Sequence, residues 1–294
     1  MELRGTKSLW AWTPAEPDLI ERIRDEAGVP HLLARVLAAR GISSADEAVR
    51  YLRADPEDLP DAALLPDADA VTGRVAAALE RGERIAVHGH DDADGVTATA
   101  VLSEALRQLG AEVDLYVPDR RTEGHGLTRR EIDHHAKRGV GLMMTVDSCV
   151  SEVELIARAS ALGIDTIVTD HHEIPPEVPD AVAVVDPKLP DSPYPYPYMA
   201  GAGVALRVAD LLLGELSGRF GTGRRARPWY DDRWYDEALS LAAIGTIADR
   251  VPLTGDNRAI VAGGLARIQG TVRPGLEALL TVAGLWGQSV SVSD

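Results

Sequence analysis

The sequence has a single cysteine, Cys149, among 294 residues. One thiol excludes a disulfide framework and any metal site built from cysteines alone. No stretch approaches the roughly 18 uninterrupted apolar residues of a transmembrane helix. The first residues contain no apolar run of signal-peptide length either. We therefore expect a cytoplasmic protein that does not bind a membrane.

Positive charge is also scarce, because 30 Lys and Arg face 46 Asp and Glu, which gives a net charge of −16. An acidic chain does not in general attract polyanions, so the balance argues against a non-specific coat for duplex nucleic acid. It is compatible with an enzyme whose acidic groups are gathered around metal ions.

The chain is expected to contain three regions. Residues 1–66 read as short helices and linkers, and their last part is rich in proline and acidic residues. Residues 67–255 alternate between strands and helices, and residues 256–294 read as a helical tail. The predicted organisation is a helical N-terminal extension, a catalytic domain, and a tail leading toward a second domain.

Five short apolar runs in the middle region are predicted as strands. Helical segments with capping residues and glycine stops separate them. Nearly continuous apolar strands that alternate with helices predict an α/β fold, a parallel five-stranded sheet covered by helices on both faces. The predicted strands are residues 84–88, 113–117, 141–146, 165–169 and 181–185.

Carboxylates and imidazoles follow these strands at their carboxyl ends. In an open parallel sheet those ends line one crevice, so residues far apart in sequence should meet there. The residues are His88, His90, Asp91, Asp92 and Asp94 after the first strand, Asp147 after the third, Asp170, His171 and His172 after the fourth, and Asp186 after the fifth.

So many acidic groups in one crevice would repel each other, and several would stay protonated. A pair of divalent cations removes this conflict. Oxygen and imidazole ligands without thiolate suit Mn²⁺ or Mg²⁺, and Zn²⁺ less well. Two such ions about 3.5–4 Å apart form the clamp that many enzymes use on phosphate esters. The pattern therefore predicts a two-metal phosphoesterase.

A second Asp-His-His triplet, residues 133–135, has a different context. It lies in the middle of a predicted helix that begins at Thr128 and ends near Gly139. Nothing in the sequence brings the interior of that helix to the crevice. We expect this triplet to lie on an exposed helical face, outside the site.

The motifs together resemble the DHH phosphoesterase family, and most closely its RecJ single-strand exonuclease branch. The resemblance covers roughly residues 30–294. The four stretches that carry it, in this order, are HGHDDADGVTATAVL, TVDSCVS, VTDHHE and IGTIADRVPL.

The resemblance implies a role for individual residues. Asp147 would bridge two ions, and His172 would contact the substrate phosphate beside the ligand His171; these three would carry the catalysis. Gly201 and Gly203 match a pair whose backbone approaches phosphate, and Arg120 or Arg121 would grip a neighbouring phosphate. The implied metal ligands are Asp92, Asp94, Asp147, His171 and Asp249.

The chain departs from the family pattern in three places. His90 stands where RecJ-like proteins usually carry Asp, so either His90 or His88 is expected to bind the first metal ion. Asp186 stands where the family more often has Asn. The family continues into a second domain with a Gly-Gly-His motif, which this sequence does not contain. We expect the chain to be the catalytic half of such a protein, or a stand-alone relative that favours short strands.

The resemblance implies hydrolysis of single-stranded DNA from the 5′ end to mononucleotides. Residues 223–235 mix Arg with Trp and Tyr, which suits strand contacts but equally a surface loop packed by its own aromatics.

Single-strand-binding, replication or repair proteins are the expected partners. Two alternatives remain: a phosphoesterase for short oligonucleotides or cyclic dinucleotides, and a non-catalytic replication scaffold. The retained motif carboxylates argue against the scaffold.

Overall fold

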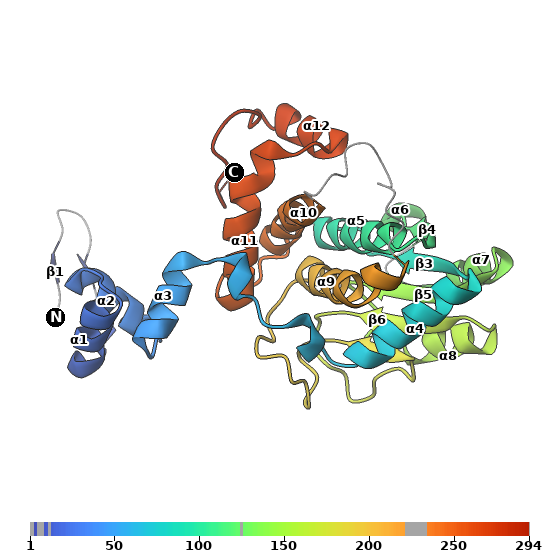
Figure 1. Ribbon diagram of the computed structural model, residues 1–294, viewed down its shortest axis with the longest axis horizontal. Coiled ribbons are helices and arrows are strands. Elements are labelled where there is room, and N and C mark those ends of the chain that lie inside the picture. Colours follow the sequence, from blue (N-terminus) through green and yellow to red (C-terminus); the bar gives the residue numbers. More distant parts are fainter. Residues whose placement is uncertain (1–2, 5–8, 11–12, 124–125, 221–233, 294) are drawn as a thin grey trace. The chain divides into compact units, whose positions relative to one another are not determined.

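The computed structural model describes residues 3–4, 9–10, 13–123, 126–220 and 234–293 (Figure 1). The chain divides into two compact units, Met1–Asp58 and Leu59–Asp294. Among the described helices, none has both the length and the apolar character needed to cross a bilayer.

The first unit contains a small helical core and a short ribbon. Three helices bury apolar side chains such as Ile23, Leu37 and Ala48 against one another. The last helix begins at the capping residue Ser44, whose hydroxyl accepts a hydrogen bond from the backbone of Glu47. The antiparallel ribbon of β1 and β2 was not predicted. The elements are β1 (Leu3–Arg4), β2 (Leu9–Trp10), α1 (Pro17–Glu26), α2 (His31–Ala39), α3 (Ala45–Arg53) and the 3₁₀ turn η1 (Pro56–Asp58).

The second unit is built on the predicted parallel sheet. Its five strands run in the order β4-β3-β5-β6-β7, and every neighbouring pair is parallel. The predicted fold class is confirmed, with strand ends that differ by two residues at most. The strands are β3 (Arg84–His88), β4 (Glu112–Tyr116), β5 (Val140–Val146), β6 (Asp165–Thr169) and β7 (Ala183–Val185).

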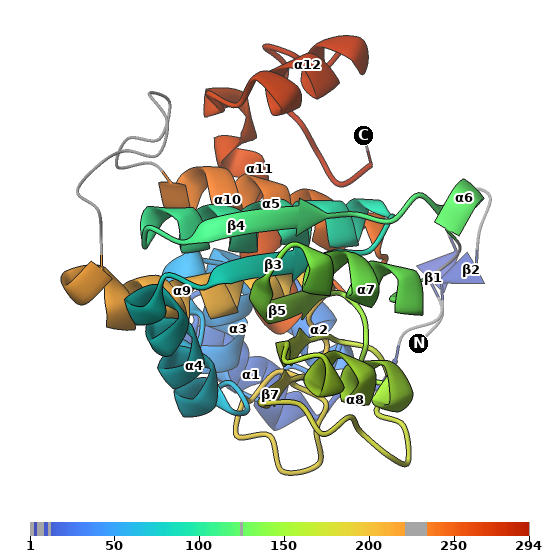
Figure 2. The same ribbon diagram turned by 90° about the vertical axis from the view of Figure 1, so that its right-hand side faces the viewer.

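Helices cover both faces of this sheet (Figure 1 and Figure 2). Side chains alternate along β3, so Ile85 and Val87 join one core while Ala86 joins the other. The first face is covered by α4 (Ala68–Arg81), α5 (Ala93–Gln108) and α9 (Gly201–Phe220). The second face is covered by α7 (Arg129–Lys137) and α8 (Val153–Ala161).

Further helices pack outside the first face. α10 (Trp234–Ala248) lies on α5 and α9, and α11 (Gly255–Arg267) lies on α10. Short elements complete the unit, namely η2 (Ala62–Leu64), α6 (Arg120–Glu123), η3 (Ile268–Gly270) and α12 (Pro274–Val282).

The unit boundary falls after Asp58, whereas the predicted boundary followed residue 66. The reason is packing, because Ala62 and Leu65 are buried in the core beneath the sheet. Residues 256–294 belong to the same unit as the sheet. Arg273, at the start of α12, binds both carboxylate oxygens of Glu104 in α5 at 2.6 and 2.5 Å.

Arg74 of α4 fastens this helix to the amino-terminal edge of the sheet. Its guanidinium contacts Asp165 and Glu83, each at 2.6 Å, and the carbonyl oxygen of Gly141 at 3.1 Å. Arg74→Ala should lower the free energy of unfolding by about 1.5–3 kcal/mol, because hydrogen bonds to charged groups are lost. Urea unfolding measures the effect.

Arg81 is the matched control on the same helix. Its side chain is 67% exposed and reaches Glu83 at 3.2 Å. Arg81→Ala should change the free energy of unfolding by no more than about 0.5 kcal/mol. Equal losses in the two variants would show that the Arg74 contacts do not fasten the helix.

Candidate metal centre

The turn after β5 places Asp147 at the carboxyl edge of the sheet. Asp147 adopts a φ of +58°, and Cys149, two residues later, a φ of +84°. Few residues other than glycine adopt such backbone conformations, and they concentrate at functional sites. The Asp147 amide donates to the carbonyl of Thr169 in β6 at 3.0 Å, which holds the turn against the neighbouring strand.

A first group of ligand atoms forms where β3 leads into α5. The Nδ1 atom of His90 lies 3.0 Å from Asp92 Oδ2 and 3.7 Å from Asp147 Oδ2. Asp92 also caps α5, since its Oδ1 accepts from the Gly95 amide at 2.9 Å. A Cβ atom on Gly95 would lie 2.4 Å from the Cβ of His90, so glycine is required for this close approach.

A second group forms around His171, which follows β6. Its Nε2 atom lies 3.7 Å from Asp94 Oδ2 and 3.8 Å from Asp249 Oδ2. The buried Asp94 accepts two backbone hydrogen bonds at the start of α9, from Gly201 at 2.7 Å and Ala202 at 2.8 Å. The amino end of that helix thus holds one carboxylate in place.

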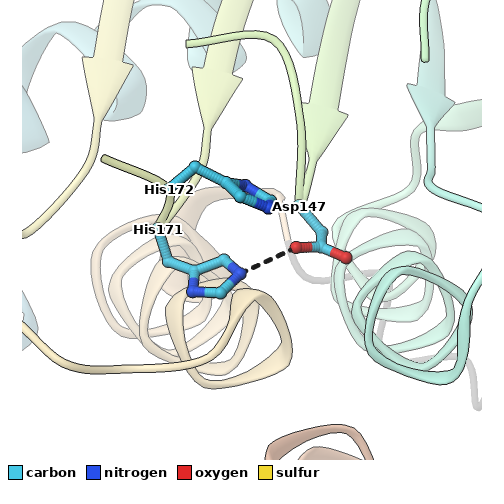
Figure 3. Close-up of side chains that lie close together, drawn as sticks. All are labelled: Asp147, His171 and His172. Atoms are coloured by element: carbon cyan, nitrogen blue, oxygen red, sulfur yellow. Dashed lines mark hydrogen bonds and ion pairs between the residues drawn. The ribbon is translucent and has the colours of Figure 1, made fainter. Parts of the chain in front are cut away.

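Asp147 lies between these two groups. Its Oδ2 faces His90, and its Oδ1 lies 3.0 Å from His171 Nε2. Figure 3 shows Asp147 and His171 pointing toward each other from the ends of neighbouring strands. Gly201 packs directly on this carboxylate, since a Cβ there would lie 2.6 Å from the Asp147 Cβ.

The electrostatics show a surplus of buried negative charge. Burial and the nearby Asp147 carboxylate raise the pKa of Asp94 to about 7. Burial also raises the pKa of Asp147. Burial opposes the charged form of His171, but the hydrogen bond to Asp147 and the surrounding carboxylates raise its pKa to about 9. Cations would relieve this surplus.

The donor atoms fit divalent ions of the Mn²⁺ and Mg²⁺ type. Within each group the ligand atoms lie within 4.8 Å of one another, close enough to share an ion. Carboxylates and imidazoles without thiolate are the ligands such ions accept. In the described part of the chain the groups are His90–Asp92–Asp147, Asp94–His171–Asp249 and Asp147–His171–His172.

Asp170 supports the site without joining these groups. Its Oδ1 accepts from the His171 amide at 2.7 Å and from His172 Nδ1 at 2.7 Å, and its Oδ2 accepts from the Val150 amide at 2.9 Å. Burial acts to raise the pKa of Asp170, but the hydrogen bond and charge of His172 hold it below the usual value. Asp170 was expected in the crevice because it follows a buried strand, but no individual role was predicted for it.

Of the two candidate histidines near β3, His90 joins the ligand groups and His88 does not. His88 is fully buried, and its ring stacks on Tyr116 at 5.3 Å between centroids. Its Nδ1 lies 3.5 Å from Nε2 of His135. Burial lowers the pKa of His88 to about 3, which keeps the ring neutral.

The second Asp-His-His triplet lies in α7, as predicted, but its face is only partly exposed. His134 is exposed and Asp133 pairs with Arg158. His135, in contrast, is fully buried, and its ring lies edge-on to the rings of both His88 and Tyr116. The expectation of a wholly exposed triplet was therefore wrong for His135.

The burial of His135 makes stability depend on pH. Burial lowers its pKa to about 4, against about 6.5 in an unfolded chain. Between pH 6.5 and about 4, His135 is protonated in the unfolded chain but stays neutral in the folded protein. This residue should therefore reduce stability by up to about 1.4 kcal/mol per pH unit as the pH falls.

His135→Phe should flatten that acid dependence, because phenylalanine does not titrate. The measurement is urea unfolding at several pH values between 4.5 and 7. The exposed neighbour gives the comparison. Burial is the main cause of the lowered pKa of His135 and the charge of His134 a smaller one, so His134→Phe should change the slope less than His135→Phe does. An unaltered slope in His135→Phe would refute the assigned cause.

The predicted phosphate contacts occupy different environments. Arg120 lies on Asp91, with Nε 2.6 Å from Oδ2, while the Arg121 side chain is 92% exposed. Gly201 and Gly203 are both buried in α9. Gly201 packs on Asp147, whereas a Cβ on Gly203 would meet Met199 and Ile260 at 3.5 Å.

Two further expectations concern the rim of the site. The side chain of His172 is 56% exposed, and its ring lies 4.6 Å from that of His171. Asp186 is fully buried and accepts from the Lys188 amide, and burial raises its pKa to about 7.

Most of the Arg- and Trp-rich segment 223–235, which was predicted to suit strand contacts or a surface loop, lies outside the described residues.

Comparison with known proteins settles the family. Residues 84–246 match the model of the DHH family, N-terminal domain. The chain belongs to the DHH family. The match extends from β3 into α10, so the DHH region contains every ligand residue named above except Asp249.

Two curated relatives of this DHH protein are single-stranded-DNA-specific exonucleases called RecJ. The one from Bacillus subtilis is 37% identical over 280 residues, which cover 95% of this chain and 33% of the relative. The one from Escherichia coli K12 is 38% identical over 275 residues, which cover 91% of this chain and 46% of the relative. The chain thus spans less than half the length of these relatives.

Solved structures of RecJ proteins also resemble this chain. RecJ from Thermus thermophilus in complex with Mn²⁺ matches 96% of this chain and 38% of that one, with a TM-score of 0.71 and 30% identity. An exonuclease RecJ bound to manganese matches 78% of this chain and 55% of that one, with a TM-score of 0.65 and 35% identity.

Proposed function

We propose that this chain is the catalytic part of a RecJ-like, metal-dependent exonuclease that hydrolyses single-stranded DNA. The observation that carries the proposal is the position of Asp147, which offers one carboxylate oxygen to each of two ligand groups. The similarity to RecJ proteins supports the substrate, and the manganese in the related structures supports the cofactor.

His90, Asp92 and Asp147 would hold one ion, and Asp94, His171 and Asp249 the other. Asp147 would bridge the two. Two bound Mn²⁺ or Mg²⁺ ions would neutralise phosphate charge and lower the pKa of an attacking water. The α9 amides fix Asp94, and Asp170 fixes the backbone of His171, so the ligands are positioned before any ion binds.

The residues around the ligands would bind the substrate phosphates. The hydrogen bond to Asp170 raises the pKa of His172, which favours a cationic ring beside His171. Arg120 and Arg121 lie in α6, which follows β4 at the same edge of the sheet. Gly201 packs against Asp147, where any larger residue would collide with the carboxylate. Gly203, in the first turn of α9, stays a predicted backbone contact to phosphate.

We place the activity at the 5′ end of the strand, with mononucleotides as products, in the cytoplasm. Single-strand-binding, replication or repair proteins are the proposed partners. The polarity, products, location and partners rest on the resemblance to the RecJ branch. The experiment below tests the polarity and products separately from the dependence on metal ions.

The test compares labelled substrates with and without Mn²⁺. A single-stranded DNA 20-mer labelled at either end, its duplex, an RNA 20-mer, a dinucleotide and a cyclic dinucleotide are incubated with the protein. We expect Mn²⁺-dependent release of mononucleotides from the 5′ end of the single strand, abolished by EDTA. Cleavage of the dinucleotides alone would identify a small-nucleotide phosphoesterase. No hydrolysis of any substrate would favour a non-catalytic scaffold.

A further inference from the structure

Three consecutive residues at the start of α11 contact three tyrosines in the loop before α9. We call residues 193–198 the tyrosine loop; in it Tyr194, Tyr196 and Tyr198 alternate with prolines. The contacting residues are Gly255, Asp256 and Asn257. About 60 residues of sequence separate the two segments, so the contacts join distant parts of the chain.

The first two contacts hold tyrosine rings. The Tyr194 hydroxyl donates to Asp256 Oδ2 at 2.8 Å, and both residues are buried. Gly255 adopts a φ of +45°, and a Cβ on it would lie 2.5 Å from the ring of Tyr196. That ring therefore occupies the space of a missing side chain, and only glycine permits the contact.

The third contact holds backbone. The side-chain amide of the fully buried Asn257 donates to the carbonyl of Tyr198 at 2.6 Å and to the carbonyl of Pro252 at 3.0 Å. The Tyr196 hydroxyl donates to the Pro252 carbonyl as well, at 3.2 Å. One amide group thus joins the tyrosine loop to the turn that precedes α11.

Each of these two segments leads to a metal-ligand group. The tyrosine loop runs into Gly201, whose amide holds Asp94 at 2.7 Å. The turn containing Pro252 begins just after Asp249, next to Arg250, which has a φ of +62°. Asp94 and Asp249 belong to the same group, the one centred on His171. The Asn257 contacts therefore join the two segments that lead to Asp94 and Asp249.

We propose that Gly255, Asp256 and Asn257 form a clamp that positions Asp94 and Asp249 for metal binding. These are positioning residues, since they act through the tyrosine loop and the turn and touch no ligand atom. The inference rests on the proposed two-metal function. It assigns a role to residues beyond the motifs that suggested the family.

A clamp and a merely structural contact predict different results. A structural contact affects the free energy of unfolding and leaves the folded site unchanged. A positioning contact also weakens metal binding at temperatures where the protein is fully folded. Groups that orient metal ligands typically change metal affinity about 10- to 100-fold when they are removed.

The experiment measures Mn²⁺ binding by electron paramagnetic resonance of the free ion, at 15 °C, for four proteins. They are the wild type, Asn257→Ala, Tyr194→Phe, and Arg74→Ala as the control. Arg74 lies at the opposite edge of the sheet, so its loss should reduce stability and spare the metal site. The melting temperature of each protein shows that it is folded during the titration.

We expect Asn257→Ala to raise the Mn²⁺ dissociation constant of the weaker site at least about tenfold, and Tyr194→Phe to raise it less, while Arg74→Ala leaves it unchanged. Wild-type affinity in both clamp variants would overturn the clamp. The clamp would also be overturned if all three variants lost Mn²⁺ affinity in proportion to their loss of melting temperature. If Asn257→Ala does not fold, Tyr194→Phe decides by the same criterion. A wild type that binds no Mn²⁺ would contradict the proposed function itself, and the clamp with it.

Discussion

Asp147→Ala should abolish hydrolysis and reduce the bound Mn²⁺ from two ions per chain to at most one. Asp147 belongs to the His90–Asp92–Asp147 group and to the Asp147–His171–His172 group, so its removal takes a carboxylate from both at once. No other carboxylate belongs to more than one of the groups found in the described residues. The loss of the bridge also removes the constraint that sets the distance between the ions.

The readouts are metal analysis of the dialysed protein and the rate of mononucleotide release. Asp186→Asn is the matched control, because it removes a buried strand-end carboxylate that lies outside the ligand groups of the described chain. This control should keep two ions and stay within about threefold of the wild-type rate. Two ions per chain in Asp147→Ala would show that the residue is not the bridge.

The two Asp-His-His triplets should respond very differently to substitution. His171→Ala should reduce the rate by several orders of magnitude, since its Nε2 lies at the centre of three carboxylates. His134→Ala should change the rate by less than about threefold and the stability by about 0.5 kcal/mol or less, as for other exposed side chains.

His135→Ala completes the series. It should destabilise the protein by creating a cavity beside His88, yet leave Mn²⁺ binding intact. Rate and urea-unfolding measurements on all three variants separate the two effects. Similar rate losses from His171→Ala and His134→Ala would mean that the wrong triplet was assigned to the site.

Much of the sheet and of the site could be predicted because the local signals agree. Nearly continuous apolar runs such as residues 141–146 are typical of parallel strands buried on both faces, and the Thr128 capping box marked the start of α7. Parallel strands end at one edge, so Asp147 and His171 had to meet there. Asp249 follows a helix, and only the family resemblance pointed to it.

The remaining features depend on tertiary contacts that no local pattern contains. His135 follows Ile132 by three residues and therefore shares its buried face, but the strongly polar sequence of α7 obscured that face. The burial of Gly203 follows from the packing of α9 on Met199 and Ile260. The Asn257 contacts join segments about 60 residues apart, so only the fold reveals them.

The central claim is that the strand-end cluster holds two ions that share Asp147. Anomalous X-ray scattering from crystals grown with Mn²⁺ tests this directly, because it locates each ion without reference to activity. We predict two peaks about 3.5–4 Å apart. One should lie among His90, Asp92 and Asp147, and the other among Asp94, His171 and Asp249. A single peak, or a peak at His88 and His135 in place of these, would contradict the account.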